Sequence, residues 1–172
     1  MGYDDHKKAA GARAVACAVI TCSDSRTQET DDSGKLIRQL LEAAGHTHPF
    51  HAISKDDPAK IRMLVAELSA RDDIQAIILN GGTGISRRDN TFDAVSGLLT
   101  RTLPGFGEVF RMLSYQSIGS GAILSRATAG IVVSGGRHVL VFSIPGSPDA
   151  VQLAMDKLIL PELSHLVWET LR

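Results

Sequence analysis

The sequence has little of several features that would narrow its function at once. Its 172 residues include two cysteines and one tryptophan, and the formal net charge is −1. A nearly neutral chain offers no electrostatic case for binding nucleic acid or an anionic membrane surface, so an anionic ligand must be held by a local site. No apolar run approaches the roughly 18 residues that a membrane span requires. We therefore expect neither a nucleic-acid partner nor a membrane partner.

The scarcity of cysteine also bears on redox state. Cys17 and Cys22 lie within one apolar run, AVACAVITC, and residues five positions apart on a strand point to opposite faces, which excludes a disulfide. The first residues, MGYDDHKKAAGA, are polar and small and carry no secretory signal, which favours a cytoplasmic protein with reduced thiols. We expect residues 1–13 to be a disordered lead-in and residues 14–172 to form a single domain.

The segment CSDSR, which begins at Cys22, resembles the first half of the zinc signature of β-class carbonic anhydrases. A zinc site of that class also needs a His-x-x-Cys further along the chain, and no cysteine follows Cys22. The clustered histidines His46, His48 and His51 straddle a predicted turn and the start of a strand. We therefore interpret Cys22 as a strand-end residue and predict no zinc site.

Short apolar runs alternate with helical patterns along the chain. The predicted strands are residues 14–22, 50–54, 74–80, 130–134 and 138–144, the last two forming a hairpin across Gly135, Gly136 and Arg137. This alternation predicts an α/β domain of three layers (αβα) with a mainly parallel sheet.

Helical spacing separates the predicted strands. One helix runs from Leu36 and ends at Gly45, and a second begins at Pro58, with Asp57 as its cap. A third helix begins near Asn90 or Thr91. We predict a mixed segment with short helices at residues 103–130. A final helix follows Ser147-Pro148 and is interrupted by Pro161.

Glycine-rich and polar segments follow the predicted strands, where open parallel sheets bind their ligands. Gly81, Gly82 and Gly84 lie within GGTG, and glycines at this density let the backbone turn sharply and aim its N–H groups outward, as an anion-binding nest does. A tight turn without a ligand is the alternative for the same residues. Arg87 and Arg88 follow at once and suit a phosphate ligand.

Two acidic residues at these strand ends lack an evident structural use. Because Asp57 already explains the helix cap, Asp56 is left over at the end of its strand. Asp89 lies between the arginines and a helix start, where an acid suits the holding of Mg²⁺ or the positioning of a nucleophile. The alternative is that Asp89 or Asn90 caps the helix.

Three segments taken together, GGTGISRRDNTFDA, PGFGEVFRMLSYQSIGSGAILSRATAG and PGSPDAV, resemble the molybdenum cofactor biosynthesis proteins MoaB and MogA, the MoaB branch most closely. The resemblance extends from Val15 to the final helix. It implies a molybdopterin-binding fold, a homo-oligomer (trimer or hexamer) and adenylyl transfer: Mg²⁺-ATP and molybdopterin give adenylylated molybdopterin and pyrophosphate. A molybdate-insertion protein would then take the product. A nucleotide-processing domain of the kind fused in competence-damage proteins is a more distant alternative.

Residue by residue, the resemblance implies catalytic roles for Asp89 and Asp56, with Asp89 as a ligand of Mg²⁺. The residues that it implies for binding ATP or molybdopterin are Ser23, Asp24, Gly81, Gly82, Thr83, Gly84, Glu108, Arg111, Ser125, Arg126, Pro145, Gly146 and Ser147. Some members of the MoaB branch lack adenylyltransferase activity. A non-catalytic protein that binds molybdopterin or a precursor is therefore the alternative.

Residues 104–118 carry more apolar surface than one small domain can bury, including Phe106, Phe110 and Met112. We expect this segment at a subunit interface, with Phe110 in the contact, so that Phe110→Asp lowers the oligomeric state.

Overall fold

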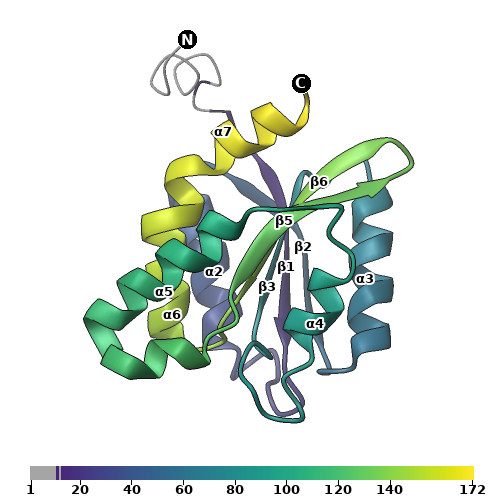
Figure 1. Ribbon diagram of the computed structural model, residues 1–172. Coiled ribbons are helices and arrows are strands. Elements are labelled where there is room, and N and C mark those ends of the chain that lie inside the picture. Colours follow the sequence, from purple (N-terminus) through teal and green to yellow (C-terminus); the bar gives the residue numbers. More distant parts are fainter. Residues whose placement is uncertain (1–10, 12) are drawn as a thin grey trace.

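The computed structural model describes residues 11 and 13–172, in which one six-stranded sheet lies between two layers of helices (Figure 1). The strands are β1 (Ala16–Cys22), β2 (Thr47–Ser54), β3 (Ala76–Asn80), β4 (Arg101–Thr102), β5 (Thr128–Ser134) and β6 (Arg137–Ile144). Their order is β2-β1-β3-β6-β5-β4; the first four are parallel, and β5 runs antiparallel to both of its neighbours. The predicted three-layer, mainly parallel α/β fold is confirmed. The predicted lead-in, apart from Gly11 and Arg13, lies outside the described residues.

The helices divide between the two faces of the sheet. They are α2 (Asp32–Ala43), α3 (Pro58–Ala70), α4 (Thr91–Ser96), α5 (Pro104–Ile118), the 3₁₀ helix η1 (Gly119–Leu124), α6 (Pro148–Ala154), the π-helical turn η2 (Met155–Ile159) and α7 (Leu160–Thr170). In Figure 1, α2, α5, α6 and α7 cover one face and α3 and α4 cover the other. The π-helical turn breaks the α-helical pattern just before Pro161, close to the predicted interruption.

Successive side chains of each strand point to opposite faces of the sheet, and this alternation creates two separate hydrophobic cores. In β1, Cys17 and Val19 face the core beneath α2, α5 and α7, whereas Ala18, Ile20 and Cys22 face the core beneath α3 and α4. Because a strand is buried on both faces only when helices cover both sides, these continuous apolar runs are what a parallel sheet requires. Both cysteines are free and buried on opposite faces, as predicted.

Helix α5 departs from the sequence prediction. It is one helix of 15 residues rather than several short ones. Gly107 permits its close approach to the residue that precedes β5, since a Cβ there would lie 2.5 Å from the carbonyl oxygen of Ala127. Phe110 is 1% exposed and belongs to the core of the subunit. The prediction that Phe110 lies in a subunit contact is therefore wrong, because this side chain points from α5 into the sheet.

The register of the strands brings their carboxyl ends to one edge. Thr21 pairs with Asn80, and Asn80 pairs with Ile144, so β1, β3 and β6 end side by side. The loops that follow them gather at the lower end of Figure 1, whereas the C-terminus lies at the upper end. The loops that follow β1, β3 and β6 therefore share one edge of the sheet.

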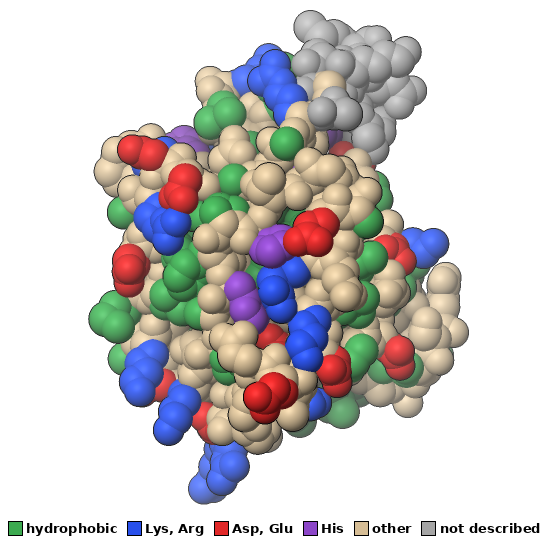
Figure 2. All heavy atoms as spheres, turned by 180° about the vertical axis from the view of Figure 1, so that it is seen from behind, with side chains coloured by type: hydrophobic (Ala, Val, Ile, Leu, Met, Phe, Trp, Pro, Cys, Tyr) green, Lys and Arg blue, Asp and Glu red, His purple; other side chains and the backbone are tan. Residues whose placement is uncertain are grey.

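The surface has no dominant sign of charge on the face drawn in Figure 2, where acidic and basic side chains are interspersed. Among the described residues, no helix is both long enough and apolar enough to cross a membrane.

Candidate ligand site at the carboxyl edge of the sheet

The turn after β3 can be made only by glycine at two positions. Gly81 and Gly82 have φ angles of +105° and +59°, which side-chain-bearing residues rarely adopt. Space is also lacking: a Cβ on Gly81 would collide with the carbonyl oxygen of Cys22, and one on Gly82 would lie 2.6 Å from Oδ2 of Asp56. The predicted sharp turn is confirmed, and it places the loop directly against the ends of β1 and β2.

This turn holds a row of backbone donors without acceptors among the described residues. Among the described residues, the N–H groups of Gly82, Thr83, Gly84 and Ile85 have no acceptor. Successive unpaired N–H groups in a tight turn make a concavity that attracts anions, because each carries a partial positive charge. The loop thus has what a phosphate-binding nest needs.

Asp56 faces this loop from the end of β2. Its Oδ1 accepts hydrogen bonds from the N–H of Asn90 (3.2 Å) and from Oγ1 of Thr91 (3.1 Å), and its own N–H donates to Oδ1 of Asp24 (3.3 Å). Burial raises the pKa of Asp56; the hydrogen bonds from Asn90 and Thr91 oppose this shift, and the charges of Asp89 and Asp24 add to it. Three loops therefore bring three carboxylates into one electrostatic neighbourhood.

Asp89 sits at the far end of the glycine loop. Its Oδ2 accepts a hydrogen bond from the N–H of Ser86 (2.8 Å), and a Cβ on Gly84 would lie 2.7 Å from the same oxygen. Asn90 does occupy the N-cap position of α4, but its side chain does not cap the helix. Its Nδ2 donates instead to the carbonyl oxygen of Asp56 (3.2 Å). Both Asp89 and Asn90 are thus used to fix the loop rather than the helix end.

The carboxylates of Asp89 and Asp56 could bind Mg²⁺ only together with oxygen ligands from a substrate. The described residues contain no group of three His, Cys, Asp or Glu side chains that could hold a metal ion by themselves. Mg²⁺ in phosphoryl-transfer sites is commonly bound by one or two carboxylates together with phosphate oxygens and water, and Asp89 with Asp56 could supply that share. Cys22 does not fit a metal site, because burial raises the pKa of its thiol to about 12.

Four other predicted residues lie around a second hollow. Glu108, Arg111, Ser125 and Arg126 line a hollow of about 410 Å³ between α5, η1 and the start of β5. Nη1 of Arg111 lies 3.4 Å from the carbonyl oxygen of Ala127, and Oγ of Ser125 is buried without a partner among the described residues. The structure therefore divides the predicted residues into a strand-edge group and a group around the hollow beside α5. Arg126 joins the two, because its side chain also donates to the carbonyl oxygens of Gly84 and Asp89.

The residues after β6 complete the strand-edge group. Gly146 packs against Gly81, since a Cβ on Gly146 would lie 3.0 Å from Cα of Gly81, and its carbonyl oxygen accepts a hydrogen bond from Oγ of Ser33 (2.7 Å). Ser147 caps α6, with its Oγ accepting from the N–H of Ala150 (3.3 Å). Pro145 joins β6 to this turn.

Sequence reasoning missed a buried polar chain beneath the site. Nδ2 of Asn80 donates to Oγ1 of Thr21 (3.0 Å), Thr21 donates to Oδ2 of Asp31 (2.8 Å), and Nε2 of His51 lies 3.1 Å from the same oxygen. Asp31 also caps α2 by accepting from the N–H of Gly34 (2.9 Å). The available signal was a polar residue at or next to the last position of each of two buried strands, Thr21 in β1 and Asn80 in β3.

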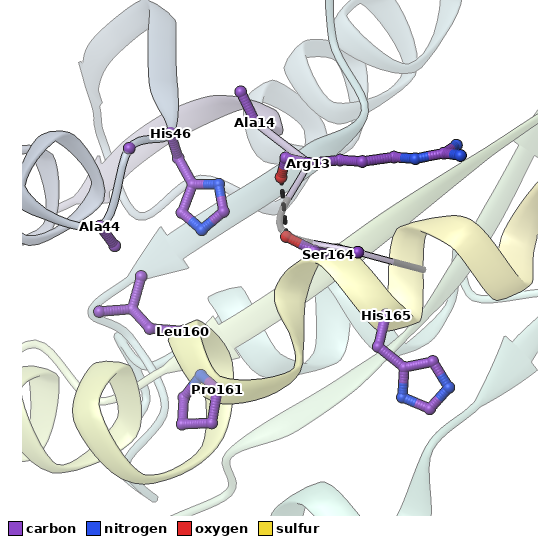
Figure 3. Close-up of a pocket in the computed structure, with 10 residues that line it drawn as sticks. Arg13, Ala14, Ala44, His46, Leu160, Pro161, Ser164 and His165 are labelled. Carbon is purple, nitrogen blue, oxygen red and sulfur yellow. Dashed lines mark hydrogen bonds between the residues drawn. The ribbon is translucent and has the colours of Figure 1, made fainter. Parts of the chain in front are cut away.

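A further hollow, of about 580 Å³, lies at the opposite edge of the sheet (Figure 3). His46, Ser164 and His165 line it, and Ser164 donates a hydrogen bond to the carbonyl oxygen of Arg13 (2.7 Å). Burial lowers the pKa of His46. Its Nδ1 accepts a hydrogen bond from the N–H of Val15 (3.1 Å), so the imidazole ring anchors the backbone just before β1. None of the residues predicted for ligand binding lies there.

The raised pKa of Asp56 makes a prediction about stability. An acid whose pKa is raised by folding stabilises the protein only at pH values where it is protonated, and that contribution is lost as the pH rises through the raised pKa. Asparagine keeps an acceptor for Asn90 and Thr91 but carries no charge. We therefore expect Asp56→Asn to raise the melting temperature at pH 7, with the gain shrinking as the pH falls through the raised pKa and vanishing below about pH 4, where the unfolded-state acid is protonated as well. Thermal melts across this range measure it, and a lower melting temperature at pH 7 would contradict it.

Comparison with known proteins gives consistent matches over nearly the whole chain. A family model described as "Probable molybdopterin binding domain" matches residues 18–165. A protein from Bacillus anthracis called molybdenum cofactor biosynthesis protein B is 51% identical over 170 residues, which is 98% of either chain. A crystal structure of a molybdenum cofactor biosynthesis protein B superimposes with a TM-score of 0.88 at 48% identity, covering 94% of this chain and 99% of the other. The tungsten cofactor synthesizing protein MoaB from Pyrococcus furiosus gives 0.83 at 34% identity, covering 93% and 99%.

Proposed function

Because the chain belongs to the molybdopterin-binding family of molybdenum cofactor biosynthesis proteins, we propose that it adenylylates molybdopterin with Mg²⁺-ATP. The observation that carries the proposal is the row of N–H groups at residues 82–85 that have no acceptor in the described part of the chain, which lies beside Asp56 and Asp89. A nest of donors flanked by acids suits a phosphate chain that arrives with a divalent cation.

The reaction needs positioning and charge neutralisation rather than a covalent nucleophile. An oxygen of the terminal phosphate of molybdopterin attacks the α-phosphorus of ATP, a new P–O bond forms, and the bond from the α-phosphorus to the bridging oxygen of the β-phosphate breaks. Adenylylated molybdopterin and pyrophosphate result. The N–H groups at 82–85 would hold phosphate oxygens, and Mg²⁺ would neutralise the charge on the leaving pyrophosphate.

The two acids take different parts in this proposal. Asp89 would serve as a ligand of Mg²⁺, because its carboxylate lies beside Gly84 in the donor row. Asp56 keeps the loop in place through Asn90 and Thr91, and its Oδ2 faces Gly82. Asp24, which follows β1, borders the same site, because it accepts from the N–H of Asp56. Ser23 lines a small cavity together with Gly81 and Gly146.

The hollow beside α5 would take the other part of a substrate. Glu108 and Arg111 lie one turn apart on α5, and a carboxylate next to a guanidinium can pair with the donors and acceptors along the edge of a pterin or an adenine. Ser125 supplies a buried hydroxyl that lacks a partner among the described residues.

We further propose that the protein works in the cytoplasm as a trimer or hexamer and passes its product to a molybdate-insertion protein. Support for assembly comes from an apolar surface that the subunit leaves exposed on α5 and η1, which includes Met112, Tyr115, Ile118, Ile123 and Leu124.

Mass spectrometry of the pterin tests the proposal. After incubation with protein and Mg²⁺-ATP, molybdopterin should be recovered with its mass increased by one adenylyl group. Molybdopterin that binds but is recovered unchanged would identify the protein as a non-catalytic binder, and molybdopterin that does not bind would exclude both functions.

A further inference from the structure

We propose that Arg126 is a positioning residue that shapes the anion nest, acting through the loop of residues 82–90 without touching the ligand. The inference deepens the proposed function and rests on it for the identity of the reaction. The arrangement of the loop itself rests on contacts within the chain.

All three nitrogens of the Arg126 guanidinium donate hydrogen bonds to the loop or to α4. Its Nε donates to the carbonyl oxygen of Gly84 (2.8 Å), its Nη2 to that of Asp89 (2.6 Å), and its Nη1 binds both carboxylate oxygens of Asp93 (2.9 and 3.1 Å). The guanidinium also lies 4.9 Å above the ring of Phe92. With each nitrogen committed, Arg126 has little left to offer a phosphate.

The backbone of Arg126 strengthens the same contact. Its N–H donates to the carbonyl oxygen of Thr83 (3.1 Å), and its Nε lies 3.4 Å from the same oxygen. One residue thus gathers the carbonyl oxygens of Thr83, Gly84 and Asp89, which are spread over seven positions of the sequence. A planar fork of donors can do this because its nitrogens are fixed at different directions.

Because of the geometry of the peptide bond, holding these carbonyl groups also orients the N–H groups of the nest. In a trans peptide, the C=O of one residue and the N–H of the next point in opposite directions, and the described residues contain no cis peptide. Turning the carbonyl groups of Thr83 and Gly84 toward Arg126 therefore turns the N–H groups of Gly84 and Ile85 away from it. These are two of the four N–H groups that lack an acceptor among the described residues.

The same rule fixes the other end of the loop. The carbonyl of Asp89 points to Arg126, and the N–H of Asn90, which belongs to the same peptide, donates to Oδ1 of Asp56 (3.2 Å). Arg126 and Asp56 therefore bind the peptide unit between Asp89 and Asn90 from opposite sides. Because the backbone of Asp89 is held in this way, the position of its carboxylate depends on Arg126.

Arg137 offers a matched control at the opposite edge of the sheet. Its Nη1 binds Oδ1 of Asp72 (3.0 Å) and its Nη2 donates to the carbonyl oxygen of Ile74 (2.8 Å). The two arginine side chains are similarly exposed, 27% for Arg126 and 32% for Arg137. Loss of either removes a bridge between a carboxylate and the backbone, but only Arg126 touches the nest.

The experiment compares binding of tripolyphosphate, with Mg²⁺ present, by calorimetry in the wild type, Arg126→Met, Arg126→Lys and Arg137→Met. We expect the dissociation constant to rise about tenfold in both Arg126 variants, because charge-assisted hydrogen bonds that shape the nest are lost. Arg137→Met should bind as the wild type does. Hydrogen exchange followed by NMR should show changed exchange rates for the amides of Gly84 and Ile85 in the Arg126 variants alone.

Each other outcome decides the matter. Wild-type affinity in Arg126→Met, or full rescue by Arg126→Lys, would overturn the inference, because lysine keeps the charge but cannot reach three acceptors at once. If Arg126→Met does not fold, Arg126→Lys alone decides between these results. A wild type that does not bind tripolyphosphate overturns the nest, whereas one that binds it but transfers no adenylyl group overturns only the proposed function.

Discussion

Replacing Asp89 by asparagine is expected to slow adenylyl transfer to molybdopterin on the order of 100-fold, the loss typical of removing a charged partner of the transition state. Binding of molybdopterin should change little, so the effect should appear in kcat more than in KM. The reason is charge rather than shape: asparagine keeps the size of Asp89 and an oxygen that can accept from the N–H of Ser86, but it cannot neutralise Mg²⁺.

Steady-state assays of pyrophosphate release measure this effect, and Asp72→Asn is the matched control. Asp72 is an exposed acid that binds Arg137 at the other edge of the sheet, so its loss changes the net charge equally without reaching the loop. Equal turnover of Asp89→Asn and the wild type would remove Asp89 from the reaction.

A single charge on the apolar surface of α5 and η1 is expected to dissociate the oligomer. Ile123 is 76% exposed, and Ile118 and Tyr115 are 65% and 61% exposed on the same two elements. Burying an unpaired carboxylate among apolar side chains is unfavourable unless it is neutralised or paired. Ile123→Asp should therefore give a folded subunit with the 18.4 kDa mass of the chain, whereas we expect the wild type to give the proposed trimer or hexamer.

Light scattering with two comparison variants separates assembly from folding. Met63→Asp places the same charge on exposed α3 and should leave the oligomer intact, since Met63 lies on the other helical layer. Phe110→Asp should instead unfold the subunit, at a cost of about 4 kcal/mol or more for a lost core aromatic. A monomeric wild type at micromolar concentration would contradict the assembly, and an unchanged oligomer in Ile123→Asp would exclude this surface.

The glycine turn was predictable because its signal is local. Gly81 and Gly82 adopt positive φ angles, and no side-chain-bearing residue satisfies both that requirement and the lack of space. The layers of the fold were predictable for a similar reason: apolar runs in β1, β3 and β6 have the length and the composition of strands buried on both faces.

Other features depend on contacts that no local pattern records. Phe110 was assigned to the wrong surface because glycines at the start of α5 obscure which face of the helix packs on the sheet. Asp31 caps α2 and also meets Thr21 and His51, so its use follows only from three elements coming together. The grip of Arg126 on Asp89 joins residues 37 positions apart, which sequence spacing alone does not reveal.

The most direct test of adenylyl transfer is pyrophosphate release measured with ATP, Mg²⁺ and molybdopterin supplied together and with each omitted in turn. The proposed reaction predicts pyrophosphate only when all three are present, in an amount equal to the adenylylated molybdopterin formed. Pyrophosphate formed without molybdopterin, or none formed with all three present and molybdopterin bound, would contradict it.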